Sequence, residues 1–366
     1  MTASGPRVSL PNPPDIRRLL IVRLGSMGDI LHTLPAAFGL RAALPEAIIG
    51  WIVEEQWADL LCATSEPRSG PRSPRRPLAD KIHLVNTKRW RKNLFSTETW
   101  ERVAAAISDL RAPQYEVAVD FQGAVRSAIL ARWSGASTIY GFRQPRENVA
   151  SMFYTRQVLA SGNHIAEQNL SLAEDVVEES LGMPSILLPC NEAAERHCTT
   201  WLQDHAVDQF VLLNPGAGWG AKQWPAERYG QVAQELAKSG FQALINYGPN
   251  EEELARAVES SSGGTATPVC WPLADLIALT RRASLFIGGD TGPLHLAAAL
   301  GIPVVALFGP TNPARNGPFG TCSIVLRDPS SQNSHQRRSR TDPGLMKIQV
   351  RDVLAAAQQF LGRSGD

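Results

Sequence analysis

Short apolar runs alternate along the chain with longer segments whose apolar residues recur at helical spacing. The first run, Leu19–Leu24, ends in a glycine-containing turn, and a helical pattern follows Asp29. The same order returns at Ala47–Glu55, Lys81–Asn86 and Tyr115–Gly123. Strands that alternate with helices are typical of βαβ units, so this part of the chain is predicted to form a parallel sheet.

A second series of strand and helix patterns follows a break near Pro184 and Pro189. Its apolar runs are Phe210–Gly218, Phe241–Pro249, Ser284–Gly292 and Pro303–Thr311. The chain is therefore predicted to be an α/β protein with two Rossmann-like domains that face a central cleft. Polar residues follow the strands in both halves, at the edge where open parallel sheets bind ligands.

The break near residue 190 sets the expected domain boundaries. We assign residues 1–189 to an N-terminal domain and 190–348 to a C-terminal domain. One helix face is apolar between Val350 and Leu361, so residues 349–366 are predicted to form a helix that packs back toward the N-terminal domain.

Composition excludes several classes of protein. Of 366 residues, 43% are hydrophobic and 19% are charged, which is typical of a globular protein with packed cores. A net charge of +1 argues against a dedicated nucleic-acid binder. The five cysteines lack the short paired spacing of a zinc or redox motif. With no secretory signal and no membrane-spanning run recognised, we expect a cytoplasmic protein, which can still act at a membrane surface.

Three loops after predicted strands carry candidate chemistry. In LGSMGD, glycines allow close approach to a ligand, and Asp29 is either a functional acid or a helix-capping residue. In NPGAGWGAK, exposed backbone amides beside Lys222 could bind phosphate oxygens. The alternative is a flexible loop with a solvated lysine and no ligand. In GGDTGPLH, Asp290 and His295 lie at a helix start suited to a diphosphate; the alternative is a helix cap and a packed histidine.

Two further segments are rich in basic residues. Lys88, Arg89, Arg91 and Lys92 surround Trp90, and such a cluster either binds an anion or is a solvated charged face. The segment Glu66–Pro77 is rich in proline, serine and arginine and has no periodicity. We interpret it as a mobile surface insertion rather than a nucleic-acid-binding tail.

The chain resembles the ADP-heptose-dependent lipopolysaccharide heptosyltransferases of glycosyltransferase family 9 over roughly residues 18–362. The motifs that carry the resemblance are RLGSMGDILHTLPA, DFQGAVRSA, PRENVASMFY, HIAEQNLSLA, KQWPAERYG and GGDTGPLHLAAALGIPVVALFGPTNP. Within the family, KRWRK and PRE favour the first heptosyltransferase, which adds heptose to the Kdo of the lipid A inner core.

The resemblance implies a GT-B fold in which the N-terminal domain, 1–189, binds the acceptor and the C-terminal domain, 190–348, binds the nucleotide sugar. It also implies an inverting, metal-independent transfer of L-glycero-D-manno-heptose from ADP-heptose, with no cofactor. Asp29 matches the family's general base. The positions that match donor-binding residues are Gly218, Lys222, Glu251 or Glu252, Asp290, Thr291, Gly292 and His295. Those that match residues facing the anionic acceptor are Lys88, Arg89, Arg91, Lys92 and His164. A lipid acceptor implies peripheral contact with the cytoplasmic face of the inner membrane.

The sequence also departs from the family pattern. Ala217 and Gly218 stand where family members place hydroxyl residues, and the insertion after Cys62 has no counterpart. The tail lacks the cysteine pattern of second heptosyltransferases, which disfavours that activity. The motifs also allow a related transferase with another acceptor or nucleotide sugar, or a non-catalytic nucleotide-sugar-binding protein. The non-catalytic role is disfavoured because Asp29 is present.

Overall fold

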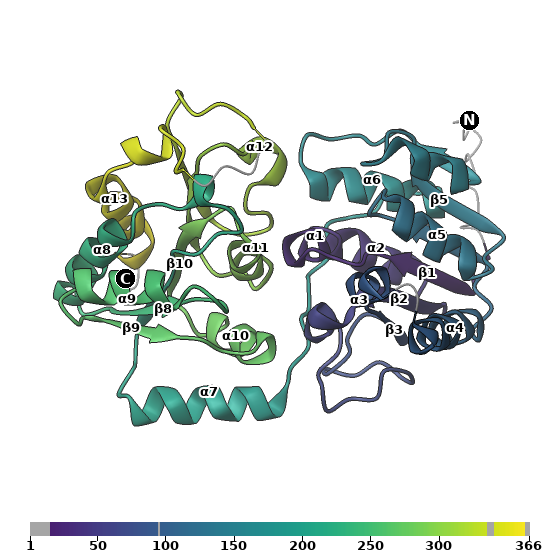
Figure 1. Cartoon of the computed structure of the whole chain (residues 1–366), viewed down its shortest axis with the longest axis horizontal. Helices are drawn as coiled ribbons and strands as arrows, with labels where there is room; N and C mark the ends of the chain where they lie inside the picture. The colour runs from purple at the N-terminus through teal and green to yellow at the C-terminus, as the bar shows by residue number, and fades with distance from the viewer. Residues whose placement is uncertain (1–14, 94–95, 335–339, 363–366) are drawn as a thin grey trace, which may run out of the picture.

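Two six-stranded parallel sheets organise the chain, as a computed structural model shows for residues 15–93, 96–334 and 340–362. The Pro-rich leader and the last four residues lie outside this described part. We call the first sheet and its helices the first lobe, and the second sheet with its helices the second lobe (Figure 1). The prediction of two α/β halves is confirmed.

The two sheets have the same strand order. In the first lobe it is β3-β2-β1-β4-β5-β6 and in the second β12-β11-β10-β7-β8-β9. The strands of the first lobe are β1 (Arg18–Val22), β2 (Ile48–Glu54), β3 (Lys81–Val85), β4 (Val117–Asp120), β5 (Thr138–Phe142) and β6 (Arg156–Val158). Those of the second lobe are β7 (Phe210–Asn214), β8 (Gln242–Asn246), β9 (Ala266–Val269), β10 (Leu285–Gly289), β11 (Val304–Phe308) and β12 (Ser323–Arg327).

Helices connect these strands. Those of the first lobe are α1 (Met27–Leu31), α2 (Leu34–Ala43), η1 (Glu55–Leu60), α3 (Thr87–Lys92), α4 (Thr97–Arg111), α5 (Val125–Trp133), η2 (Asn148–Phe153) and α6 (Ile165–Val177). The remainder are α7 (Glu192–Asp204), η3 (Gly220–Lys222), α8 (Ala226–Lys238), α9 (Glu252–Ser261), α10 (Leu273–Thr280), α11 (Gly292–Ala299), α12 (Pro313–Asn316), η4 (Leu345–Lys347) and α13 (Val350–Leu361).

Strand order places a switch point at the middle of each sheet. β1 lies between β2 and β4, and β7 lies between β10 and β8, so the connections leave these central strands in opposite directions. Loops diverge at the carboxyl ends of such strands and open a crevice for ligands. In Figure 1 the central helices that follow β1 and β10, α1 and α11, face each other between the lobes.

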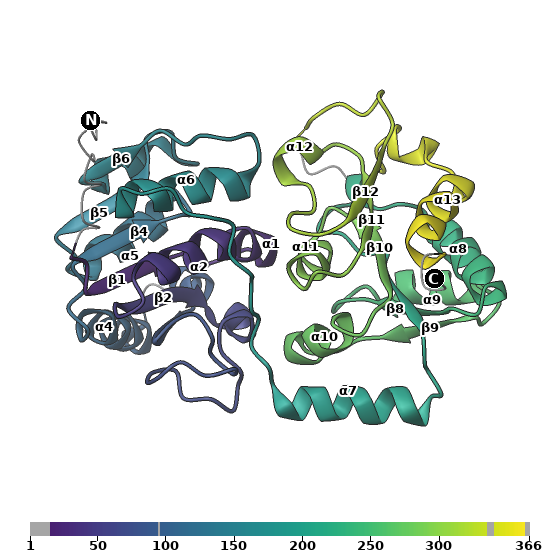
Figure 2. The ribbon, with the colours of Figure 1, turned by 180° about the vertical axis from the view of Figure 1, so that it is seen from behind.

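The lobes share buried apolar surface. One core cluster includes Leu31 and Leu34 of the first lobe together with Leu276 and Leu294 of the second. α7 follows the extended linker between the lobes and packs on α10, along the lower edge of the second lobe in Figures 1 and 2. Removal of this apolar surface from water stabilises the contact between the two lobes.

The C-terminal helix packs differently from our expectation. α13 contacts α8, β10, β11 and β12, and its buried residues Val353, Ala356 and Ala357 belong to the core of the second lobe. The prediction that it packs toward the N-terminal domain was therefore wrong. The apolar stripe itself is present, but periodicity alone does not specify which surface a helix covers.

Four strands were not recognised in the sequence, namely β5, β6, β9 and β12. The last three lie at or near sheet edges and carry partly exposed residues. β5 alternates buried and half-buried positions. None of the four forms the long continuous apolar run that marks a buried parallel strand, so the sequence pattern does not identify them as strands.

The Glu66–Pro77 insertion is more ordered than we expected for a mobile segment. The buried Arg76 guanidinium donates to the carbonyl oxygens of Pro67, Gly70 and Pro71, with distances of 2.6 Å to Gly70 and 2.7 Å to Pro71. The Ile82 amide of β3 also donates to the Arg68 carbonyl at 2.8 Å. A single internal cation thus organises a segment that has no helical or strand periodicity.

Candidate active site

Two glycines allow the helices α1 and α11 to meet between the lobes. A Cβ atom added at Gly28 would lie 2.7 Å from Cδ2 of His295, and one added at Gly292 would lie 2.7 Å from Sδ of Met27. Contacts this short exclude any side chain unless the neighbours move. The loop that carries Asp29 and the loop that carries Asp290 are therefore brought to the same region.

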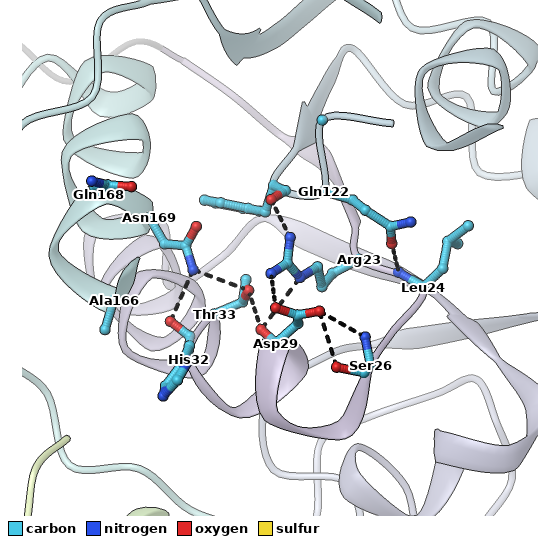
Figure 3. A network of polar contacts seen from close by, with 12 residues as sticks. Arg23, Leu24, Ser26, Asp29, His32, Thr33, Gln122, Ala166, Gln168 and Asn169 are labelled. Atoms are coloured by element: carbon cyan, nitrogen blue, oxygen red, sulfur yellow. Dashed lines mark hydrogen bonds and ion pairs between the residues drawn. The ribbon is translucent and has the colours of Figure 1, made fainter. Parts of the chain in front are cut away.

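The Asp29 carboxylate is held from two sides (Figure 3). Its Oδ1 lies 3.1 Å from Nη2 of Arg23, while Oδ2 accepts hydrogen bonds from the Ser26 amide at 2.9 Å and the Ser26 hydroxyl at 3.0 Å. Burial opposes the charge, but Arg23 and the two Ser26 donors outweigh it and lower the pKa of Asp29. The side chain is 37% exposed, so an ionised carboxylate remains accessible at the start of α1.

Both interpretations of Asp29 from the sequence agree with this geometry. The residue is the third of α1 and forms a capping box with Ser26. A capping role and a chemical role are compatible, because the same contacts that satisfy the helix start also orient the carboxylate.

Arg23 was missed in the sequence. Its side chain is 6% exposed and lies against Asp29 in Figure 3. It also donates to the carbonyl oxygen of Phe121. Phe121 follows Asp120, whose buried carboxylate accepts from Ser127 at 2.9 Å and Tyr154 at 2.8 Å. A lone cation directly after β1, inside the apolar run Leu19–Leu24, was the available signal, because a buried arginine needs a partner.

We expect replacement of Arg23 by glutamine to move the acidic limb of the kcat/KM profile toward higher pH. Arg23 lowers the pKa of Asp29, so its loss raises that pKa and Asp29 becomes protonated in less acidic buffer. Arg23→Lys, which keeps the charge, is the matched control and should move the limb less. An unchanged limb in a folded Arg23→Gln protein would contradict this role.

A buried ion network lies at the start of α11 in the second lobe. Asp290 Oδ2 lies 2.6 Å from Nζ of Lys222, and Oδ1 lies 3.1 Å from Nε2 of His295. Burial alone would raise the pKa of Asp290, but His295 and Lys222 outweigh it and hold that pKa below its usual value. Lys222 and the Asp290–His295 pair, which the sequence placed in separate loops, are thus brought into one cluster.

The neighbouring loop residues complete this side of the site. Thr291 occupies the N-cap position of α11, and its hydroxyl accepts from Nδ2 of Asn214, the last residue of β7, at 3.4 Å. Gly292 is the first residue of α11. Gly218 is exposed in the loop before Lys222, with open space where a side chain would project. The loop after β7 and the start of α11 therefore present backbone amides beside a cationic group.

The structure distinguishes Glu251 from Glu252. Glu251 Oε2 accepts from the Gly248 amide at 2.8 Å, and a Cβ added at Gly216 would lie 2.3 Å from the same oxygen. The Glu251 carboxylate thus contacts the loop that leads to Lys222. Glu252 is exposed at the first turn of α9, where it accepts from the Asn250 amide at 3.4 Å.

Three histidine rings meet where the lobes touch. The His32 ring centroid lies 4.3 Å from that of His295 and 5.1 Å from that of His164. Burial, followed by the nearby His295 and His164, lowers the pKa of His32 well below its usual value. His32 was not singled out in the sequence, since a histidine on a helical pattern is usually a packed side chain.

His164 links the two lobes. Its Nδ1 accepts from the Ala166 amide at 3.1 Å, so in the neutral ring Nε2 carries the proton and donates to the Gly317 carbonyl at 3.0 Å. Burial lowers the pKa of His164, which favours this neutral form. The ring also stacks on Phe319, with centroids 4.7 Å apart. His164 thus faces the second lobe and is not part of the basic helix.

The predicted basic cluster forms α3 at the carboxyl end of β3. The Asn86 side chain caps it by accepting from the Arg89 amide at 3.1 Å. Lys88, Arg89, Arg91 and Lys92 are all at least partly exposed, and Arg89 lies 3.4 Å from Glu98. The cations are therefore available to an anion at the same sheet edge that carries the Asp29 loop.

Neither a membrane span nor a metal cluster is found in the described part of the chain. No helix within the described ranges is long and apolar enough to cross a membrane. No group of three or more histidine, cysteine, aspartate or glutamate side chains among these residues has metal-binding geometry.

The sequence profile of glycosyltransferase family 9 (heptosyltransferase) matches residues 103–345. The chain is 30% identical to Lipopolysaccharide heptosyltransferase 1 of Escherichia coli O18:K1:H7, covering 87% of this chain and 93% of that one. It is 29% identical to the Pseudomonas aeruginosa protein of the same name, covering 84% and 83%.

Solved structures agree with these relatives. An Escherichia coli heptosyltransferase with ADP superimposes with a TM-score of 0.74 at 27% identity, over 94% of this chain and 99% of that chain. Escherichia coli ADP-heptose heptosyltransferase II shares the fold, with a TM-score of 0.73 at 19% identity over 96% and 100%. The two facing Rossmann-like lobes are thus the GT-B fold, and the chain belongs to glycosyltransferase family 9, the heptosyltransferases.

Proposed function

We propose that this protein transfers L-glycero-D-manno-heptose from ADP-heptose to a Kdo residue of the lipid A inner core, with inversion and without a metal ion. The observation that carries the proposal is the approach of two loops, one with the Asp29 carboxylate and one with the Lys222, Asp290 and His295 cluster. The names of the relatives, Lipopolysaccharide heptosyltransferase 1, support this substrate class. So does the heptosyltransferase structure solved with ADP-2-deoxy-2-fluoro heptose.

In the proposed reaction Asp29 acts as the general base. An acceptor hydroxyl attacks the anomeric carbon from the face opposite the ADP group and loses its proton to the carboxylate. The contacts with Arg23 and Ser26 keep Asp29 ionised and fix its orientation. They also make it a weak base, so the proton moves mainly as the new glycosidic bond forms.

Residues of the second lobe hold the donor. We assign the diphosphate to Lys222, to the amides of Thr291 and Gly292 at the start of α11, and to the loop amide of Gly218. The position of these residues at the start of α11 and beside Asp290 supports the assignment. His295 donates to the same group, and Asp290 accepts from heptose hydroxyls. Lys222 and His295 both contact the Asp290 carboxylate, which holds their side chains close together. Both can then donate hydrogen bonds to the negative charge that develops on ADP.

We further propose that Glu251, rather than Glu252, binds the ribose hydroxyls, since its carboxylate contacts the donor loop. Glu251→Gln should then raise the KM for ADP-heptose by roughly tenfold, the cost of weakening a charged hydrogen bond. Glu252→Gln should have a smaller effect, because Glu252 points to its own helix start. A larger loss for Glu252→Gln would reverse the assignment.

The acceptor is assigned to the first lobe. Lys88, Arg89, Arg91 and Lys92 of α3 supply cations for an anionic acceptor, and His164 closes the region between the lobes. We retain the division into residues 1–189 for acceptor and 190–348 for nucleotide sugar. Since the proposed acceptor is a lipid, we place the protein in the cytoplasm, in peripheral contact with the inner membrane.

The test is product analysis with purified protein, ADP-heptose and Kdo-lipid A. Mass spectrometry should detect one added heptose, and NMR should show an anomeric configuration opposite to that of the donor. EDTA should leave turnover unchanged. Faster transfer from UDP- or GDP-sugars, or transfer only to an acceptor that already carries heptose, would favour the related transferases over this function.

A further inference from the structure

A cavity of about 470 Å³ opens on the outer edge of the first lobe. Its walls come from β3, α3, α4 and the insertion, which contributes Arg68 and Ser69. Near Asn86 and Arg89 it reaches the carboxyl end of β3, the sheet edge that also carries the Asp29 loop. The cavity therefore lies beside the proposed acceptor helix α3 at this sheet edge.

The insertion forms a defined wall rather than a loose flap. Ser69 pairs with Lys81 of the edge strand β3 in an antiparallel bridge, and the Gly70 amide donates to the Asp80 carbonyl at 3.1 Å. On its other side, the Arg76 guanidinium holds the carbonyl oxygens of the turn. The position of Arg68 at the cavity rim is thus determined by main-chain contacts on either side of it.

Cations outnumber carboxylates around the cavity. Arg68, Lys81, Arg89 and Arg102 line it, against Glu55 and Asp109. Lys81 is paired with Asp109 at 2.6 Å, and Arg102 with Glu98 at 2.8 Å. Arg68 forms no ion pair with any residue that the structure describes. An exposed guanidinium without a carboxylate partner is suited to a carboxylate or phosphate of a ligand.

The floor of the cavity is partly apolar. Trp90, which is half-buried, lines it together with the small side chains of Ala105 and Ala106 from α4. A flat aromatic face with cationic and amide groups around it suits the ring of a sugar that carries a negative charge. A nucleotide-sugar donor is assigned to the other lobe, so the ligand would belong to the acceptor side.

We propose that this cavity is a subsite for an additional anionic sugar unit of the acceptor, adjacent to the sugar that receives the transferred residue. The inference rests on the proposed function and extends it to a part of the acceptor that does not react. Because one wall comes from an insertion without counterpart in the family pattern, the subsite would give this protein its own acceptor preference.

The test compares three acceptors with the wild type and an Arg68→Ala/Arg102→Ala variant. They are Kdo-lipid A, the same lipid with a second Kdo, and Kdo-lipid A without its lipid A phosphates. We expect the variant to lower kcat/KM by roughly tenfold only for acceptors that carry the recognised group, as loss of charged hydrogen bonds implies. A loss confined to the two-Kdo acceptor identifies a sugar carboxylate. A loss that disappears after dephosphorylation identifies a sugar phosphate.

Arg72→Ala is the matched control from the same insertion. Arg72 points away from the cavity, toward Asp80 at 3.7 Å and the Pro45 carbonyl at 3.2 Å. The subsite would be overturned if the double variant lost kcat/KM equally with all three acceptors, or lost none with any of them. If no acceptor is glycosylated, the proposed function fails instead. In that case the binding of each acceptor, presented in micelles, to the wild type and to the double variant is measured instead. The subsite is supported if the double variant loses affinity only for acceptors that carry the recognised group.

Discussion

Replacing Asp29 by asparagine is expected to lower kcat by about a thousandfold while leaving the affinity for ADP-heptose nearly unchanged. A positioned general base contributes typically about 10²–10⁴ in rate, and asparagine cannot accept the proton. Asparagine keeps an oxygen that can accept from the Ser26 amide, so the start of α1 retains a cap. Single-turnover kinetics and calorimetric titration with ADP-heptose separate the chemical step from donor binding.

Asp175→Asn is the control for this experiment. Asp175 is an exposed residue of α6, so the change removes one carboxylate without touching the proposed site. Turnover of Asp29→Asn within a few fold of the wild type would show that another group takes the proton. A large loss of donor affinity would instead show that α1 acts mainly by holding the lobes together.

The second large effect is expected for Lys222→Ala. Removal of a preorganised donor from developing negative charge costs about 10²–10³ in rate, and we expect a loss of this size in kcat/KM. Lys222 also pairs with the buried Asp290, so the variant leaves that carboxylate with His295 alone. The expected loss therefore includes a less ordered donor loop as well as weaker stabilisation of the departing ADP.

Lys238→Ala removes a surface lysine of α8 that pairs with Glu235 at 2.6 Å, and it should leave the rate unchanged. A thermal unfolding curve for Lys222→Ala separates a local effect from general destabilisation. If the variant keeps its fold and its wild-type kcat/KM, Lys222 does not contact the donor diphosphate and the assignment of the second lobe must be revised.

Much of the site was visible in the sequence because its signals are local. A glycine loop between a buried strand and a helix requires only a few neighbouring residues, so Asp29, Lys222 and Asp290 could all be placed at the carboxyl ends of strands. Arg23 was missed because it directly follows β1 within the run Leu19–Leu24, whose other residues are apolar. The charge within that run was itself the sign of a buried partner.

Contacts between distant segments could not be predicted in the same way. The sequence left Glu251 and Glu252 equivalent, and only the approach of the Glu251 carboxylate to Gly216 separates them. His164 matched an acceptor-facing position, yet its ring donates to Gly317 in the other lobe. The insertion has no periodicity, so its order could not be predicted: it comes from the Arg76 side chain and from main-chain contacts with β3 and the residue before it.

By itself the sequence determined the two α/β lobes and the candidate loops, because strand and helix periodicity and short glycine motifs depend on neighbouring residues. Its motifs also indicated the family, through their resemblance to the heptosyltransferases. The tertiary structure decided which of these loops meet, which surface α13 covers, and how Asp29 and Asp290 are paired. Such choices depend on packing and charge between segments far apart in the chain, and a one-dimensional pattern does not contain those distances.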